Sequence, residues 1–203
     1  SEVTEINLND RSIKLGNRPD IPFDCLSLNI GSRPDSALIT GATDHALAVK
    51  PIDRFLGKWE SIKQQASTAM AAGRDYRLAI VGGGPASVEL AFASQIAINP
   101  VESGNKQAPG RLQICLFTAA DQLLSGHNAR SREFARQELE RRGIEIRFGS
   151  RVDRFDKNRL VLTDGTELKC DSAIYATGAS LPEWPFQCGL AKSEDGFIEV
   201  GPT

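Results

Sequence analysis

The stretch Arg77–Ala93, RLAIVGGGPASVELAFA, decides the fold. An apolar run ends in the three glycines Gly82, Gly83 and Gly84, and a helical pattern starts directly after them. Gly82 allows a tight turn out of a strand, and Gly84 lets a phosphate approach a backbone that has no side chain there. Ser87 departs from the usual small third residue of this pattern, yet it is short enough for a helix to pack closely on a strand.

The residues after the glycines favour an anion site. Pro85 suits the first turn of a helix, where its missing N–H costs nothing. The remaining free N–H groups of that turn point into the gap, and the helix dipole adds partial positive charge. A site of this kind has the size for a pyrophosphate. A purely structural strand–helix turn without a ligand is the alternative.

The surrounding pattern predicts a doubly wound α/β arrangement. An amphipathic helix is expected around PIDRFLGKWESIKQQASTAM, in which Phe55, Trp59 and Ile62 recur at helical spacing. A strand, the glycine loop, a helix and the strand LQICLF follow, with NPVESGNKQAPG as a long surface loop. The helix ARSREFARQELERRG ends at Gly143, before the strand IEIRF. The order β-α-β-α-β is typical of a nucleotide-binding domain.

An internal repeat relates residues 2–34 to residues 151–182. Both segments predict antiparallel hairpins followed by an apolar strand, CLSLNI in the first and SAIYAT in the second. Asp24 and Asp171 are 147 positions apart, and so are Gly31 and Gly178. Only the second copy has a glycine loop before it, so we expect this chain to be a piece of a longer protein with a further loop upstream. Coincidence between two β-meanders is the alternative.

Composition excludes several classes of function. The 203 residues are 40% hydrophobic and 25% charged with a formal net charge of −2, which argues against nucleic acid as the main partner. No apolar run approaches the ~18 residues of a membrane span, and the N-terminus does not have the pattern of a signal peptide. The four cysteines form no CxxC pair, so we expect buried, reduced thiols in a cytoplasmic protein. Neither His45 nor His127 is predicted to be catalytic.

The end of the strand LQICLF is where the adenosine ribose would be recognised. Thr118 occupies this place and offers a neutral hydroxyl, whereas a carboxylate would favour NAD and an arginine NADP. Asp121 lies further round the turn, and Arg130 and Arg132 are more typical of a solvated helix face. We therefore expect weak discrimination, within roughly tenfold, between NADH and NADPH.

The sequence resembles the two-dinucleotide-binding-domain flavoproteins of the pyridine nucleotide-disulphide oxidoreductase superfamily. The motifs GGGPASVELAFA, DCLSLNIGSRPD and DSAIYATGASLP carry this resemblance, which is closest to the type II NADH dehydrogenase-like branch. ALAVKPIDRFLGKW, LLSGHNAR and GLAKSEDGFIEV are similar to the flavoprotein module fused to selenide, water dikinase, a possible partner. The resemblance implies a Rossmann-like NAD(P)H-binding domain with a β-meander at 36–181, inserted in partial FAD-binding segments at 1–35 and 182–203.

The resemblance also implies roles for single residues. Gly82 to Ala86 would hold the pyrophosphate of NAD(P)H, and Thr177 and Gly178 match the turn beside the nicotinamide. Glu89 matches a glutamate near the nicotinamide end, whereas the residues alone favour a surface carboxylate near a helix N-terminus. The expected function is part of an FAD-dependent NAD(P)H oxidoreductase, inactive as an isolated fragment, with an unknown electron acceptor and no proton-transferring side chain in this piece. A non-enzymatic nucleotide-sensing or docking module is the alternative. The disulphide-reductase cysteine pair of the family has no counterpart here.

Overall fold

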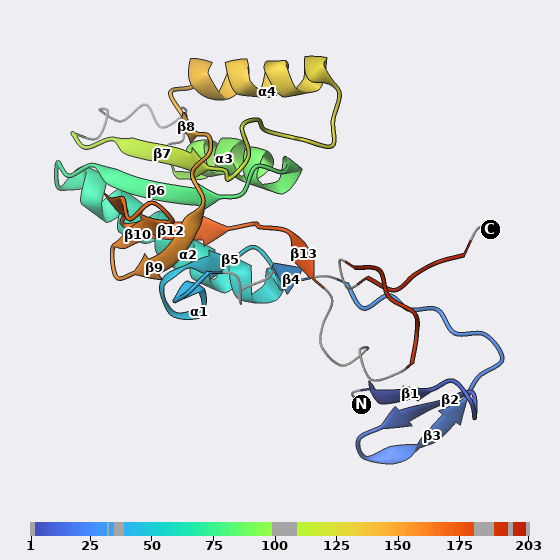
Figure 1. Ribbon diagram of the computed structural model, residues 1–203. Helices are drawn as coiled ribbons and strands as arrows, with labels where there is room; N and C mark the ends of the chain where they lie inside the picture. The colour runs from blue at the N-terminus through green and yellow to red at the C-terminus, as the bar shows by residue number, and fades with distance from the viewer. Residues whose placement is uncertain are drawn as a thin grey trace. The chain divides into compact units, whose positions relative to one another are not determined.

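The computed structural model describes residues 3–31, 33–34, 39–98, 109–180, 189–194 and 197–201. The chain divides into two compact units (Figure 1). The larger unit is Pro34–Gly178, and the smaller unit combines Ser1–Arg33 with Ala179–Thr203. Two short strands, β4 (Arg33–Pro34) and β13 (Ala179–Ser180), pair with each other.

A parallel sheet with the strand order β5-β12-β6-β7-β8 forms the centre of the larger unit. Its strands are β5 (Leu47–Ala48), β6 (Tyr76–Val81), β7 (Leu112–Phe117), β8 (Glu145–Arg147) and β12 (Ser172–Tyr175). The helices are α1 (Ala42–His45), α2 (Ile52–Ala71), α3 (Pro85–Ile98) and α4 (Ala129–Arg141). The predicted order β-α-β-α-β is confirmed, whereas most of the predicted loop NPVESGNKQAPG lies outside the described residues.

Two hydrophobic cores lie on opposite faces of this sheet. Along β6, Leu78 and Ile80 pack with helices α2, α3 and α4, whereas Ala79 and Val81 pack on the other side with a β-meander (Figure 1). Successive strand residues point to opposite faces, and both faces are covered, so β6 has the continuous apolar sequence typical of a buried parallel strand. The predicted amphipathic helix is confirmed as α2, in which Phe55 and Ile62 are buried. The ring of Trp59 stacks on that of Phe55 with 5.9 Å between the ring centroids.

The meander consists of β9 (Val152–Asp156), β10 (Arg159–Leu162) and β11 (Glu167–Lys169), which pair antiparallel. Val152 and Phe155 of β9 both pack against the sheet although they are three positions apart, because the pairing of β9 with β10 shifts register between them. β12 follows directly and joins the parallel sheet next to β6. The second copy of the predicted repeat therefore has the expected hairpins and the expected buried strand.

The first copy of the repeat differs from the prediction. Its hairpins form β1 (Val3–Asn7), β2 (Ser12–Leu15) and β3 (Arg18–Pro22), in that order in an antiparallel sheet. The run CLSLNI at residues 25–30, however, forms no strand and is only partly buried, and Cys25 is exposed. A strand in the interior of a parallel sheet is held by hydrogen bonds to a neighbouring strand at each edge, and no described strand pairs with this run. The predictions of a buried strand and of a buried Cys25 are therefore wrong.

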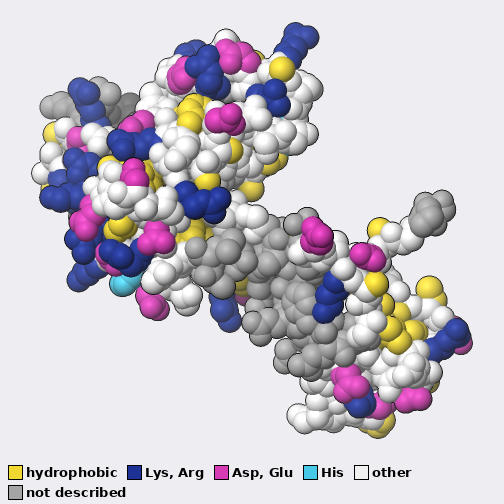
Figure 2. All heavy atoms as spheres, in the orientation of Figure 1, with side chains coloured by type: hydrophobic (Ala, Val, Ile, Leu, Met, Phe, Trp, Pro, Cys, Tyr) yellow, Lys and Arg dark blue, Asp and Glu magenta, His cyan; other side chains and the backbone are white. Residues whose placement is uncertain are grey.

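The surface of the larger unit has mixed charge. On the face in Figure 2, basic and acidic side chains intermix over α4, where Arg136 pairs with Glu133 and Glu140 at 2.7 Å each. Among the residues that the structure describes, no helix is both long enough and apolar enough to span a membrane.

Candidate functional site

A cavity of about 500 Å³ opens at the carboxyl ends of the central strands. It is lined by three segments that directly follow β6, β12 and β7, namely Gly82–Gly84, Ala176–Gly178 and Thr118–Ala120. We call it the glycine-loop cavity. Because β7 lies on one side of β6 and β12 on the other, the strand order reverses at β6. Ligands of doubly wound sheets bind at such a switch point, outside the carboxyl ends of the strands.

The absence of a side chain has a different structural cause at each end of the glycine loop. Gly82 has a φ of 137°, and a Cβ atom there would meet the Ser87 hydroxyl and the Ala176 carbonyl. A Cβ atom on Gly83 would meet the side chain of Thr118. Packing within the protein thus explains these two glycines. A Cβ atom on Gly84 would meet nothing within 4 Å. The missing side chain of Gly84 therefore leaves space that the protein itself does not fill.

Polar groups without partners surround that space. The Gly84 carbonyl accepts hydrogen bonds from the N–H groups of Ser87 and Val88, which starts helix α3. Among the described residues, none accepts a hydrogen bond from the N–H of Gly83, Gly84 or Ala86. The buried Thr177 hydroxyl, in the wall of the cavity, also has no partner in the described part of the chain. The N–H groups are the free donors of a helix N-terminus and fit an anion. The buried Thr177 hydroxyl fits a polar group of a bound ligand, because buried polar groups are normally paired.

Thr118 is held firmly at the other side of the loop. Its side chain is 4% exposed, and its hydroxyl accepts a hydrogen bond from the Ala120 N–H at 3.2 Å. Its backbone continues the pairing of β7 with β8: the Thr118 N–H donates to the Arg147 carbonyl, and the Thr118 carbonyl accepts from the Ser150 N–H at 2.8 Å. This pairing brings the segment after β8 into the wall of the cavity.

Six of the nine predicted site residues come together in the wall of the cavity: Gly82, Gly83, Gly84, Thr118, Thr177 and Gly178. The other three, Pro85, Ala86 and Glu89, lie on exposed positions of α3 outside the residues that line it.

The cavity also has lining residues that sequence reasoning missed, among them Ser150, Arg151 and Asp153. They come from the junction of β8 and β9. The predicted β-α-β-α-β order could have placed them there, because β7 and β8 pair in parallel and their carboxyl ends lie side by side.

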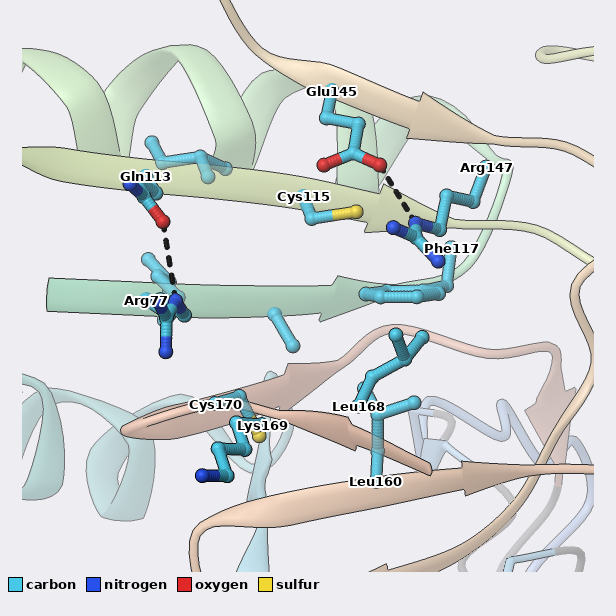
Figure 3. A pocket seen from close by; sticks show the side chains of 13 residues that line it. Arg77, Gln113, Cys115, Phe117, Glu145, Arg147, Leu160, Leu168, Lys169 and Cys170 are labelled. Atoms are coloured by element: carbon cyan, nitrogen blue, oxygen red, sulfur yellow. Dashed lines mark hydrogen bonds and ion pairs between the residues drawn. The ribbon is translucent and has the colours of Figure 1, made fainter. Parts of the chain in front are cut away.

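A second cavity, of about 250 Å³, lies between the sheet and the meander (Figure 3). Its walls carry the paired side chains of Glu145 and Arg147 and the thiols of Cys115 and Cys170. Burial raises the pKa of Cys115 to about 12 and that of Cys170 to about 11. Both thiols are therefore protonated at neutral pH and are poor nucleophiles. In the described part of the chain no cluster of His, Cys, Asp or Glu could hold a metal, so the glycine-loop cavity remains the candidate site.

The family comparison agrees with this geometry. The family model for pyridine nucleotide-disulphide oxidoreductase matches residues 1–203. The chain belongs to this family. External alternative NAD(P)H-ubiquinone oxidoreductase B3, mitochondrial, of Arabidopsis thaliana is 26% identical over 66% of this chain and 24% of its own length. Type II NADH:quinone oxidoreductase Ndh of Mycobacterium tuberculosis is 26% identical over 88% of this chain and 42% of its own length. These relatives confirm the predicted superfamily and its type II NADH dehydrogenase-like branch.

The fold is also that of solved reductases. The crystal structure of reduced Bacillus anthracis CoADR-RHD superposes with a TM-score of 0.68 at 18% identity, over 98% of this chain and 34% of that one. The chain thus spans less than half the length of the proteins it matches.

Proposed function

We propose that this chain binds the nicotinamide dinucleotide of an FAD-dependent NAD(P)H oxidoreductase and presents it for hydride transfer to the flavin. The observation that carries the proposal is the open space in front of Gly84, at the switch point of the sheet, with unpaired N–H groups beside it. A pyrophosphate fits this space in size and in charge. The names of the quinone oxidoreductase relatives support the same chemistry.

Each part of the cavity then has a task. The loop Gly82–Gly84 and the start of α3 at Pro85 and Ala86 hold the pyrophosphate, and Thr118 lies toward the adenosine ribose. Thr177 and Gly178 orient the nicotinamide, near which Glu89 is placed by the family resemblance. When bound, the reduced nicotinamide supplies a hydride. The chain itself binds and orients, because most of the chemistry belongs to such cofactors.

The larger unit corresponds to the NAD(P)H-binding domain that we propose for residues 36–181. Residues 1–35 and 182–203 would be parts of an FAD-binding domain in the intact protein. The names of the relatives indicate quinone acceptors for those proteins, whereas the acceptor here is unassigned. A cytoplasmic location and a link to selenide, water dikinase remain predictions from the sequence.

The proposal is tested by titrating NADH and NADPH into the purified chain and into Gly84→Val. The valine would fill the open space, so we expect at least a hundredfold weaker binding with an unchanged fold by circular dichroism. Gly57→Val is the matched control, because Gly57 is exposed on α2 and a Cβ atom there also meets nothing within 4 Å. Nucleotide binding that survives in Gly84→Val, or is absent from the unmodified chain, would contradict the proposal and favour a non-enzymatic docking module.

A further inference from the structure

Arg151 lies beside the place where the adenosine ribose is expected. It follows Ser150, whose N–H donates to the Thr118 carbonyl at 2.8 Å, and its own carbonyl accepts from the Thr163 N–H at 3.0 Å. The backbone of Arg151 is thus fixed between the end of β7 and the meander. Its side chain is exposed and lines the glycine-loop cavity. Among the described residues that line this cavity, Arg151 carries the only positive charge.

The guanidinium of Arg151 also differs from those of its neighbours, because it forms no ion pair with a residue that the structure describes. Arg147 pairs with Glu145 at 2.7 Å, and Arg154 pairs with Asp156 at 3.1 Å. Arg151 forms no side-chain hydrogen bond or ion pair with a described residue. Asp153 lies two residues further along the chain, on the same face because Val152 between them is buried.

We propose that Arg151 is a specificity-determining residue that selects NADPH by binding the 2′-phosphate of its adenosine ribose; this rests on the proposed function. A guanidinium binds phosphate through two parallel charged hydrogen bonds, which are stronger than neutral ones. The segment after β7, in contrast, has no carboxylate in the wall of the cavity that would bind the 2′-hydroxyl of NADH and repel a phosphate. Asp121, the acidic residue nearest to Thr118 in that turn, is not among the lining residues.

The test uses adenosine 2′,5′-bisphosphate and adenosine 5′-monophosphate, which differ only in the 2′-phosphate and lack the nicotinamide. We expect the unmodified chain to bind the bisphosphate at least tenfold more tightly, and this preference to weaken with added salt. Arg151→Ala should reduce the ratio to within about threefold by weakening the bisphosphate alone, and Arg151→Lys should keep part of it. Arg154→Ala is the matched control, because this nearby arginine pairs with Asp156 and is not among the residues that line the cavity, and it should retain the full preference. Asp153→Asn removes a negative charge from the wall of the cavity and should retain or increase the preference. Circular dichroism checks the fold of each variant.

Three results would overturn the assignment. In the first, Arg151→Ala keeps the preference, which would place the 2′-phosphate elsewhere. In the second, Arg151→Ala weakens both probes equally, which would place Arg151 on a group that they share. In the third, the unmodified chain prefers the monophosphate and loses that preference in Asp153→Asn, which would make Asp153 the residue that reads the ribose. If one of these results is found while NADH and NADPH still bind, only the assignment of Arg151 fails and the proposed function stands. If the chain binds no nucleotide at all, both proposals are overturned.

Discussion

At the scale of single residues, the glycine loop separates two uses of glycine. Gly82 and Gly83 lack side chains because Ser87, Ala176 and Thr118 occupy the space that a Cβ atom would need. Gly84 lacks one although the protein leaves that space open. The first two glycines are therefore explained by folding, and the third by the ligand that we propose. Substitutions can measure this difference, because stability and nucleotide binding respond separately.

We predict that alanine at position 83 lowers the stability of the fold, whereas alanine at position 84 weakens nucleotide binding. Gly83→Ala should destabilise the larger unit by about 1–3 kcal/mol, since the new methyl overlaps the Thr118 side chain. Gly84→Ala should leave stability unchanged or raise it by up to ~1 kcal/mol through the unfolded state, while it weakens nucleotide binding. Urea unfolding and nucleotide titration on the same samples measure both quantities.

The double variant Gly83→Ala with Thr118→Ala provides the control for this prediction. It should recover part of the stability lost in Gly83→Ala, because residues in contact show non-additive effects. Equal destabilisation by alanine at positions 83 and 84 would mean that Gly84 too is needed for folding.

The sequence could predict the residues around the loop but not all of the ribose site. Gly82–Gly84 follow a strand within a few residues, so local pattern alone places them at its carboxyl end. Thr118 follows the next strand and was predicted in the same way. Arg151 is 33 positions after Thr118 in the sequence and reaches the cavity only through pairing of β7 with β8. The expected weak choice between NADH and NADPH rested on the segment after β7 alone, and Arg151 changes that expectation.

At the scale of secondary-structure elements, the repeat shows what local pattern leaves undecided. Both copies have alternating residues and polar turns, and both form three-stranded antiparallel meanders. The final apolar run becomes a strand only in the second copy, where β6 and β5 pair with β12 on its two sides. Alternation determines a hairpin between neighbouring segments, whereas a parallel strand depends on partners far away in the sequence. Hence the same motif yields β12 in one copy and no strand at residues 25–30 in the other.

We predict that Asp171, at the start of β12, anchors this strand to β6. One carboxylate oxygen accepts from the Arg77 N–H at 2.8 Å, and the other pairs with Arg74 at 2.6 Å. Asp171→Ala should therefore destabilise the larger unit by about 1–3 kcal/mol, because the backbone donor loses a charged acceptor. Thermal unfolding followed by circular dichroism measures the loss.

The repeat supplies a matched control for Asp171. Asp24 holds the equivalent position but forms no hydrogen bond or ion pair with a described residue. Asp24→Ala should thus change stability by less than about 0.5 kcal/mol, as is usual for an exposed site without partners. Similar losses in the two variants would show that the motif itself, rather than its contacts, is responsible.

At the scale of the whole molecule, the candidate site belongs entirely to the larger unit. Every described residue that lines the glycine-loop cavity lies within Pro34–Gly178. The helices and the meander that cover the two faces of the sheet come from the same unit. We therefore expect the larger unit to bind the nucleotide by itself. The flavin that we propose as the hydride acceptor would be held by parts of the intact protein outside this unit.

The last prediction follows from this division of the molecule. A ligand that binds only the folded state at a hundredfold excess over its Kd stabilises that state by about 2.7 kcal/mol. With NADPH at this excess, amide hydrogen exchange of β6, β7 and β12 should slow by about a hundredfold wherever exchange requires unfolding of the larger unit. Amides of β1 and β2 in the smaller unit should keep their rates, because none of the described residues of that unit lines the cavity. Mass spectrometry of peptides from both units, with Gly84→Val as the variant that should show no slowing, makes the comparison. Equal slowing in both units would instead mean that they unfold as one cooperative body, so that the nucleotide stabilises residues far from its own site.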